Sequence, residues 1–252
     1  MGKERNRSDV QATSAPGKTL NPWGAPVVRG RFLRRYKRFF VDVSIDGVVV
    51  TAHTSNTGAM TGMLMPDAPV LLTNHDKGKR TYPLELEAVD VGSSWICCNT
   101  IRSNRVAEAF LRAGIFPELG AFSEVEREVP LGDSRVDLHL RCGANEPTCF
   151  VEVKSVTLRD GDVGLFPDAV SERATKHANC LARAAAQGQR TALLFLVQRK
   201  DVLRVSTAAA IDPVYAKAVR RAVKAGVEVL AAAVDVDDDG ISCAGRLPVD
   251  LS

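Results

Sequence analysis

Two acidic residues and a lysine in the second half of the chain have the types and the spacing of a metal-dependent phosphodiesterase site. Asp137 interrupts the apolar run SRVDLHL, and 15 residues later the run FVEVK carries Glu152 and Lys154. Because side chains alternate along a strand, Glu152 and Lys154 share one face, and a hairpin through RCGANEP would bring Asp137 beside them. Two carboxylates and a backbone carbonyl offer Mg²⁺ the oxygen ligands it prefers, and the lysine could orient or activate the attacking water.

The same three residues have a plainer interpretation. An acid, a gap of this length and the triplet ExK occur by chance in many proteins, and Glu152 and Lys154 could form an ion pair on an exposed strand face. The context favours the metal site, since both acids lie in apolar strands flanked by predicted helices. Spacing by itself leaves the two interpretations open.

The second half of the chain alternates helices and strands. SNRVAEAFLRAG predicts a helix from about 104 to 113, and the strands EVEREVPL, SRVDLHL and CFVEVKSVTL follow. A long loop through GDVGLFPDA leads to a helix from about 171 to 187, the strand TALLFLVQ, a further helix and the strand VEVLAAAVDV. This order predicts an α/β domain with a mixed central sheet over residues 93–245.

The first half has the texture of a small all-β domain. Residues 26–92 contain the short β runs FFVDVSI, GVVVTAH, PVLLTN and YPLELEAVDV, separated by turn residues and without a helical period. They predict a five-stranded barrel of the oligonucleotide-binding (OB) type. Residues 1–25 are rich in Ser, Pro, Gly and charge, and they predict a flexible basic tail outside the fold.

Positive charge is concentrated in the first half. The net charge is +3, and residues 1–92 hold 13 Lys and Arg against 9 Asp and Glu. The run VVRGRFLRRYKRFF mixes basic and aromatic residues without an acid, which suits phosphate neutralisation and base stacking. A charge-protected edge strand is the alternative, and the density of unpartnered positive charge favours binding. The residues expected to contact nucleic acid are Arg31, Arg34, Arg35, Tyr36, Lys37 and Arg38.

Two further sets of polar residues have two interpretations each. His53 and Asn56, in HTSNTG, could contact phosphate or form hydrogen bonds only within their own turn. Arg173, Lys176 and His177 recur at helical spacings. They form either a phosphate-binding cluster beside the metal or a charged outer helix face.

The remaining composition excludes several classes. The six cysteines form no CxxC pair and no histidine lies at zinc-finger spacing, which argues against a structural zinc site and for reduced thiols in the cytoplasm. The apolar run TALLFLV is far shorter than the roughly 20 residues that cross a bilayer. The N-terminus has no apolar stretch typical of a secretory signal. We therefore expect a cytoplasmic protein with no membrane partner.

Several runs resemble the bacterial sugar fermentation stimulation protein A family. They are RYKRFF at 35–40, HTSNTGAMTG at 53–62, NTIRSNR at 99–105, and CFVEVKSVTL with GLFPDAVSERATKH between 149 and 177. The resemblance implies an OB barrel followed by a restriction-endonuclease-like domain of the PD-(D/E)xK type. It also implies that Asp137, Glu152 and Lys154 are the catalytic set, and Glu108 is the natural candidate for the helix glutamate that such nucleases often add as a metal contact.

Two functions follow as expectations. The preferred one is a DNA-binding protein that hydrolyses a phosphodiester bond with Mg²⁺, for which Mn²⁺ can substitute. The alternative, which the family's name suggests, is a non-enzymatic DNA-binding transcriptional regulator of maltose-type sugar metabolism with a vestigial metal site. A third interpretation gives the charged strand and the acid pair only structural roles. DNA against RNA, strandedness and oligomeric state stay open, although paired cuts in a duplex would require two sites, as in a dimer.

Overall fold

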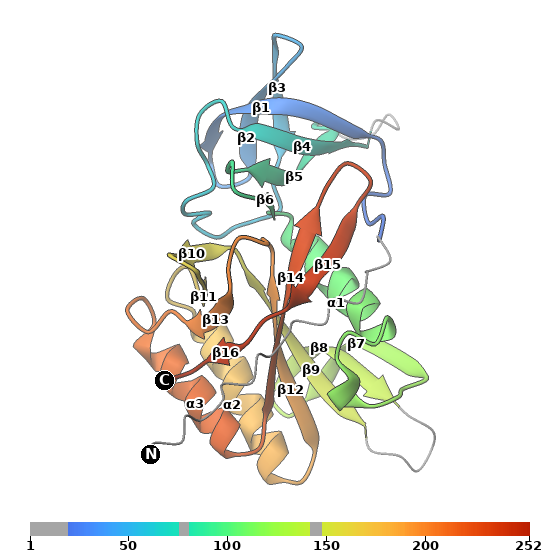
Figure 1. Ribbon diagram of the computed structural model, residues 1–252, viewed down its shortest axis with the longest axis vertical. Helices are drawn as coiled ribbons and strands as arrows, with labels where there is room; N and C mark the ends of the chain where they lie inside the picture. Colours follow the sequence, from blue (N-terminus) through green and yellow to red (C-terminus); the bar gives the residue numbers. More distant parts are fainter. Residues whose placement is uncertain (1–19, 76–80, 142–147) are drawn as a thin grey trace, which may run out of the picture.

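The computed structural model describes residues 20–75, 81–141 and 148–252, and all structural statements below concern these residues. Figure 1 shows an elongated molecule with a β-barrel at one end of its long axis and an α/β domain at the other. The architecture predicted from the sequence, a barrel followed by a mixed α/β sheet, is confirmed.

The barrel is a closed five-stranded sheet. Its strands are β1 (Val27–Tyr36), β2 (Phe40–Ile45), β3 (Val48–His53), β4 (Pro69–Asn74) and β5 (Leu84–Asp90). The pairings β1–β2, β2–β3, β3–β5, β5–β4 and β4–β1 form a ring, in which only β3–β5 is parallel. Buried residues from every strand fill its interior. The short strand β6 (Trp95–Cys97) pairs antiparallel with β5 and leads into the second domain.

The second domain is built on a six-stranded mixed sheet in the order β15-β14-β12-β9-β8-β7. The strands are β7 (Glu124–Leu131), β8 (Ser134–Arg141), β9 (Cys149–Val156), β12 (Arg190–Val197), β14 (Glu228–Val236) and β15 (Ile241–Arg246). β12 runs parallel to both β9 and β14, and the outer pairs are antiparallel. The central strands β9 and β12 are buried on both faces, and they therefore read as apolar runs in the sequence.

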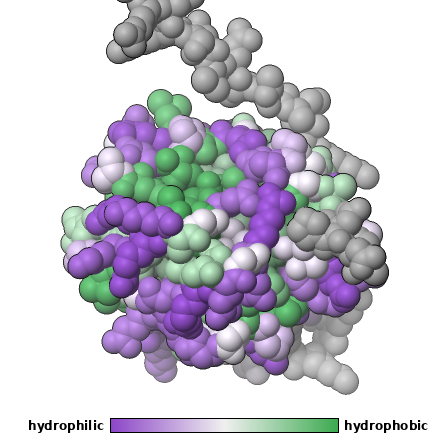
Figure 2. Space-filling model, turned by 90° about the horizontal axis from the view of Figure 1, so that it is seen from below, coloured by the Kyte–Doolittle hydropathy of each residue, from purple (hydrophilic) through white to green (hydrophobic). Residues whose placement is uncertain are grey.

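Helices cover the two faces of this sheet. α1 (Ser103–Arg112) packs with one core cluster, and α2 (Glu172–Ala186) and α3 (Pro213–Lys224) pack with the other. The Ser171 side chain caps α2 by accepting from the Ala174 amide, and Asp212 caps α3 in the same way. The short 3₁₀ helices η1 (Thr100–Arg102) and η2 (Pro117–Leu119) flank α1. Seen from the end opposite the barrel, the surface is largely hydrophilic around an apolar area (Figure 2).

A small second sheet differs from the expected long loop. It consists of β10 (Leu158–Asp160), β11 (Val163–Phe166), β13 (Arg204–Thr207) and β16 (Val249–Asp250). β10 and β11 form a hairpin, but β11 pairs in parallel with β13, about 40 residues further along the chain. Such a pairing leaves no local sequence signal, which explains why the segment did not read as strand.

The boundary of the predicted N-terminal tail was placed too late. Leu20 pairs with Ile241 at the end of the sheet, and Trp23 is 1% exposed within the core that α1 shares. One buried indole outweighs the polar composition around it, so the segment from Leu20 belongs to the folded body. Residues 1–19 lie outside the described part of the chain.

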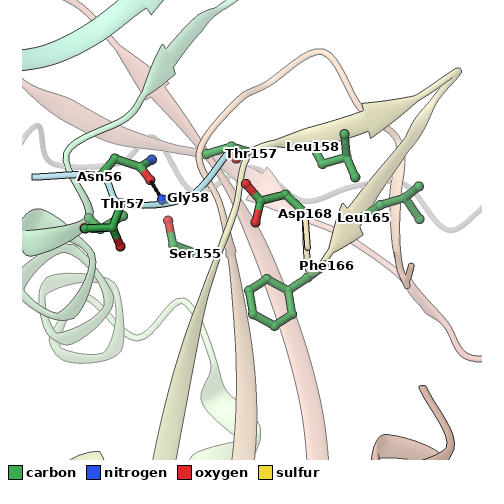
Figure 3. Close-up of a pocket in the computed structure, with 10 residues that line it drawn as sticks. Asn56, Thr57, Gly58, Ser155, Thr157, Leu158, Leu165, Phe166 and Asp168 are labelled. Atoms are coloured by element: carbon green, nitrogen blue, oxygen red, sulfur yellow. Dashed lines mark hydrogen bonds between the residues drawn. The ribbon is translucent and has the colours of Figure 1, made fainter. Parts of the chain in front are cut away.

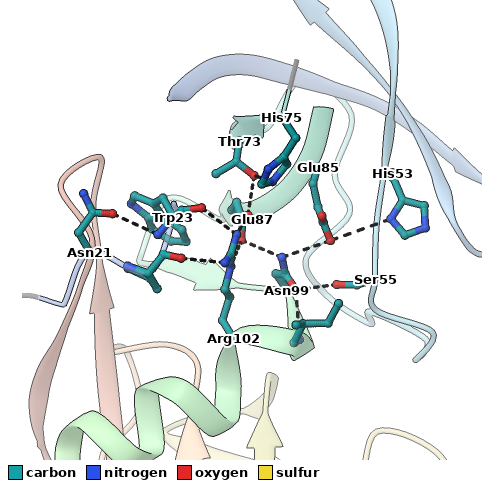
Figure 4. Close-up of polar contacts among 12 residues, drawn as sticks. Asn21, Trp23, His53, Ser55, Thr73, His75, Glu85, Glu87, Asn99 and Arg102 are labelled. Carbon is teal, nitrogen blue, oxygen red and sulfur yellow. Dashed lines mark hydrogen bonds and ion pairs between the residues drawn. The ribbon is translucent and has the colours of Figure 1, made fainter. Parts of the chain in front are cut away.

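A buried ion pair joins the barrel to α1 (Figure 4). Glu87 on β5 is 1% exposed, and its Oε1 accepts from the Arg102 guanidinium at 2.6 Å and from the Thr73 hydroxyl at 2.7 Å. Its Oε2 accepts from the Asn99 amide at 2.9 Å. Arg102 also donates to the Pro22 carbonyl at 2.7 Å. Because Arg102 directly precedes α1, this network fixes the start of the helix relative to the barrel.

None of the helices within the three described ranges is long and apolar enough to cross a membrane.

Candidate metal centre and nucleic-acid surface

Asp137 lies where β8 and β9 diverge. Their ladder pairs Leu138 with Val151 and continues to Leu140, but it does not extend back to Asp137. The Asp137 Oδ2 instead accepts from the Val153 backbone N–H at 2.7 Å. The carboxylate thus replaces a carbonyl of the missing ladder, and this hydrogen bond holds it in the fork between the strands.

Glu152 is 2% exposed, and its two carboxylate oxygens differ in their surroundings. Oε1 accepts from the Lys154 ammonium at 2.7 Å and also contacts Nδ1 of His177 on α2. Oε2 is buried and accepts no hydrogen bond from any described residue. A buried carboxylate oxygen without a donor is unfavourable unless a ligand satisfies it. Together with the oxygens of Asp137, it provides the type of donor set that a divalent cation prefers.

Lys154 is buried rather than exposed on a strand face. Its ammonium lies 2.7 Å from Glu152 and 6.0 Å from the centroid of the Phe166 ring. The ion-pair interpretation of the ExK triplet is therefore correct about the contact but wrong about its exposure. The positive charge of this buried lysine therefore lies next to the carboxylates of the fork.

Burial raises the pKa of both acids, but the net shifts of the two pKa values are in opposite directions. For Asp137, burial and then the charge of Glu152 raise the pKa, against the opposing effect of the hydrogen bonds from Val153 and Asn104. For Glu152, burial alone would raise the pKa, but the hydrogen bond from His177 and the charge of Lys154 outweigh it, so the pKa is lowered. The ionised form of Asp137 is therefore electrostatically disfavoured, and a bound cation would stabilise its negative charge.

Glu108, the candidate third metal contact, does not reach the carboxylate pair. Its Oε1 accepts from Arg112 at 2.9 Å and its Oε2 lies 2.6 Å from Arg127. Asn104, one helical turn earlier on α1, is the residue that reaches Asp137, through a 2.9 Å hydrogen bond from Nδ2 to Oδ1. No set of three acidic, histidine or cysteine side chains that could hold a metal forms within the described ranges. The structure thus places an amide where the sequence suggested an acid.

The three polar residues of α2 do not form one cluster. His177 is buried against Glu152, whereas Lys176 is exposed and lies 4.0 Å from Asp133 in the β7–β8 turn. Arg173 is exposed one turn before His177 on the same side of the helix, and it makes no ion pair with any described residue. Successive helix positions turn by about 100°, so Lys176 points away from the fork that His177 faces.

The basic run on β1 divides into committed and available residues. Arg35 donates to the backbone carbonyls of Arg38, Gly58 and Asn56, and it therefore clamps the loop that follows β3. Arg34 donates to Asp42 at 2.7 Å, which also accepts from the Tyr36 hydroxyl, and Arg31 donates to the Asp67 carbonyl at 3.0 Å. Only Lys37 and Arg38, in the turn between β1 and β2, are exposed without a side-chain partner among the described residues.

Aromatic rings surround this turn. Phe39 is 44% exposed and stacks with His53 at a centroid distance of 6.3 Å, and Phe40 contacts Tyr82 at 4.8 Å. The rings and the two free cations form one basic and aromatic surface at an end of the barrel. Phe39 and Phe40 lie within the run RYKRFF, whose composition signalled them, whereas nothing local identified Tyr82.

The HTSNTG turn serves the fold at Asn56. The Asn56 Oδ1 accepts from the Gly58 N–H at 2.8 Å, as in an Asx turn, and Asn56 is buried. His53 lies 4.0 Å from Glu85 and keeps an exposed side chain within the aromatic surface. Of the two interpretations of this motif, the structural one describes Asn56, and the surface position of His53 is compatible with binding.

One arginine beside the fork was not singled out from the sequence. Arg135 lies two residues before Asp137 on β8, and because side chains alternate along a strand, the two residues share one face. Arg135 is exposed and forms no ion pair in the part of the chain that the structure describes. With Arg173 on α2, it brings unpaired positive charge near the acids from two different elements.

Comparisons with known proteins match both domains. The family model described as the SfsA N-terminal OB domain matches residues 33–98, and the sugar fermentation stimulation protein RE domain matches residues 101–240. The chain is 42% identical over 226 residues to the sugar fermentation stimulation protein homolog of Citrifermentans bemidjiense, covering 89% of this chain and 97% of that protein. A homolog from Shewanella baltica is 44% identical over 210 residues, covering 82% and 89%.

A solved structure agrees with the whole fold. Pyrococcus furiosus SfsA in complex with Ca²⁺ superposes with a TM-score of 0.83 at 26% identity, and the match covers 94% of this chain and 100% of that one. The two domains define a protein with an OB barrel and a restriction-endonuclease-like module. The chain belongs to the sugar fermentation stimulation protein family.

Removal of the disfavoured negative charge of Asp137 should stabilise the metal-free protein. We expect Asp137→Asn to raise the free energy of unfolding at pH 7 in EDTA, because burial and Glu152 disfavour the ionised Asp137. The Asn104 amide can turn over and accept from the new amide, so the hydrogen bonds are kept.

The sign of the pH dependence follows from the raised pKa. Above the folded-state pKa the penalty is fully present, and below the ordinary aspartate pKa of about 3.9 it is absent, since the carboxyl is then protonated in both states. Urea unfolding of the wild type and of Asp137→Asn, from pH 7 down to below the ordinary aspartate pKa, measures the difference between their free energies of unfolding. A gain that does not shrink as the pH falls, or a loss of stability at pH 7, would contradict this electrostatic account.

Proposed function

We propose that this protein binds DNA and hydrolyses a phosphodiester bond with a divalent cation held by Asp137 and Glu152. The observation that carries the proposal is the buried Glu152 Oε2, which has no hydrogen-bond donor among the described residues and belongs to a carboxylate beside Asp137 at the fork of two strands. Evolution toward stability alone would place a donor or an apolar residue there.

The donor set fits a hard cation. Carboxylate oxygens from Asp137 and Glu152, with water and substrate phosphate, are the ligands typical of Mg²⁺. The related Pyrococcus furiosus protein is described in complex with Ca²⁺, which supports a divalent ion in this family. We assign Mg²⁺ here, with Mn²⁺ as a substitute. When bound, the cation would supply the positive charge that polarises the phosphate and the attacking water.

The chain's own residues supply the rest. His177 and Lys154 fix the orientation of the Glu152 carboxylate, and Asn104 does the same for Asp137. The Lys154 ammonium lies close enough to the acids to offset charge that grows on the phosphate in the transition state. Arg135 on β8 and Arg173 on α2 have no ion-pair partner among the described residues, and in this proposal they would hold flanking phosphates.

The barrel supplies a second contact with the nucleic acid. Loops at the ends of strands 1–2 and 4–5 and the face of strands 2–3 form the binding surface in OB folds generally. In this chain the β1–β2 turn carries Lys37 and Arg38, and Phe39, Phe40 and Tyr82 surround it. Cations with exposed rings suit a single strand, whose phosphates are neutralised while its bases stack.

Binding without cleavage is the second candidate, and one observation favours it. The Glu152 Oε1 is engaged by both His177 and Lys154, so the lysine is already committed to the acid beside it. A regulator of sugar metabolism would need the barrel surface but not turnover. The two candidates differ in one measurable property, hydrolysis of nucleic acid in the presence of Mg²⁺.

Cleavage should depend on the residues of the fork. We expect the purified protein to cut DNA in Mg²⁺ or Mn²⁺, and Asp137→Ala and Lys154→Ala to lower the rate by at least about 100-fold, because each removes a group that stabilises the transition state. Gel assays with supercoiled, linear and single-stranded DNA, and with RNA, measure the rate.

Glu108→Gln is the matched control. It removes an acid from α1 that is paired with Arg112 and Arg127, so its rate should remain close to that of the wild type. Activity that survives in Asp137→Ala and Lys154→Ala would come from a contaminant. Binding without cleavage would then be the remaining candidate function.

Nucleic-acid affinity should depend on the β1–β2 turn. For the double variant Lys37→Ala and Arg38→Ala, we expect the slope of log K against log salt concentration to flatten by about 1.4 for a single strand, since each lost phosphate contact contributes about 0.7. Fluorescence anisotropy over a salt series measures this slope.

A double variant at the opposite end of the molecule controls for net charge. Lys217→Ala with Arg220→Ala removes the same two charges from the exposed side of α3. Its slope should match that of the wild type. Equal slopes for all three proteins would exclude the turn as a contact surface.

A further inference from the structure

A pocket of about 200 Å³ lies where the barrel meets the second domain (Figure 3). The barrel supplies one wall through Asn56, Thr57 and Gly58, the loop that Arg35 clamps. The end of β9, the β10–β11 hairpin and Asp168 supply the other wall. Neither domain forms this pocket alone, and the residues of the carboxylate fork are not among those that line it.

Asp168 brings a carboxylate without hydrogen-bond donors to this pocket. It is half-buried and accepts no hydrogen bond within the described ranges. Arg35 interacts with it electrostatically, but the Arg35 hydrogen bonds go to backbone carbonyls. Figure 3 shows the carboxylate directed toward the barrel loop, where a Cβ on Gly58 would lie only 3.0 Å from the Asp168 Oδ2. A side chain at position 58 would therefore collide with the carboxylate, and glycine keeps this side of the pocket free of one.

The lining also contains hydroxyls and an aromatic ring. The side chains of Ser155 and Thr157 make no hydrogen bond with other described residues, so both can donate to a ligand. The Phe166 ring lines the pocket and packs against Tyr215 at a centroid distance of 5.3 Å, which fixes its orientation. The Lys154 ammonium lies over the same ring. The pocket and the candidate catalytic centre therefore share Phe166 as a wall.

We propose that this pocket binds one guanine base of a single-stranded nucleic acid whose phosphate lies at the Asp137–Glu152 centre. The inference rests on the proposed function and adds a base preference to it. An ionised carboxylate only accepts hydrogen bonds, and its two oxygens match the adjacent N1–H and N2–H₂ donors of guanine. The neighbouring O6 accepts from a serine or threonine hydroxyl.

The other bases match the pocket less well. Adenine and cytosine present one amino donor beside a ring-nitrogen acceptor, and thymine presents one N–H between two acceptors, so none pairs with both oxygens of Asp168. The volume lies below the roughly 300–1,000 Å³ of sites for drug-sized ligands, which suits a single base rather than a nucleotide pair. The edge that is read is free only in a single strand or in an extruded base.

Oligonucleotides that differ in one base test this assignment. Labelled dT10 and the same strand with one central guanine, adenine or hypoxanthine are titrated with the full-length protein in Ca²⁺ by fluorescence anisotropy. We expect guanine to tighten binding about tenfold over dT10, as a good bidentate contact does, and adenine to give no gain. Hypoxanthine lacks the N2 amino group and should give a smaller gain than guanine.

Variants of this chain locate the preference. Asp168→Asn offers one donor and one acceptor in place of two acceptors, and it should bring the variant's affinity for the guanine strand to within about twofold of its affinity for dT10. Asp160→Asn makes the same charge change at an exposed position of the neighbouring hairpin and should keep the preference. Gly58→Ala narrows the pocket without changing charge and should reduce the preference. Circular dichroism and urea unfolding confirm that each variant folds.

The outcomes separate this inference from the proposed function. Wild-type protein that binds every strand equally, or an Asp168→Asn variant that keeps the preference, overturns the guanine pocket but leaves nucleic-acid binding intact. No binding of any strand overturns both. Competition by dGMP identifies the source of the base. If dGMP displaces the guanine strand at a concentration no higher than the Kd of that strand, the pocket binds a free nucleotide and the strand assignment is wrong.

Discussion

The burial of the Glu152 carboxylate beside the half-buried Asp137, at the point where β8 and β9 separate, is the constraint around which the second domain is organised. Three of the four carboxylate oxygens accept hydrogen bonds, and the donors come from three directions: Asn104 on α1, the backbone and Lys154 of β9, and His177 on α2. The fourth, the Glu152 Oε2, has no donor within the described residues. A sheet with helices on both faces can bring donors from both sides to one fork, which a surface ion pair could not do.

The barrel is held in a fixed relation to this fork. The buried Glu87–Arg102 pair ties β5 to the residue directly before α1, and α1 carries the Asn104 that contacts Asp137. Arg35 shapes the barrel loop that closes the pocket against the second domain. Breaking a buried pair of this kind typically costs about 3–5 kcal/mol. The contacts that stabilise the two-domain arrangement therefore also set where a strand held by the barrel would enter the candidate centre.

The sequence predicted the parts that depend on local periodicity and missed those that depend on packing. Alternation along β9 placed Glu152 and Lys154 on one face. The order of helices and strands predicted the N-terminal barrel and the α/β domain that follows it. Helix register against a sheet has no local signal, and it decided that Asn104 rather than Glu108 reaches Asp137. Similarly, the basic run looked uniform in sequence, but the turn geometry committed Arg35 to three carbonyls. Family resemblance supported the site residues but could not resolve these choices.

The central claim is that the two acids of the fork, Asp137 and Glu152, hold a divalent cation. Thermal unfolding with increasing Mg²⁺ or Ca²⁺ tests it without requiring turnover, because a ligand that binds only the folded state raises the Tm with its concentration. We expect a saturating rise for the wild type and for Glu108→Gln, and none for Glu152→Gln. A wild-type Tm that does not respond to either cation, or a rise that Glu152→Gln retains, would contradict the account.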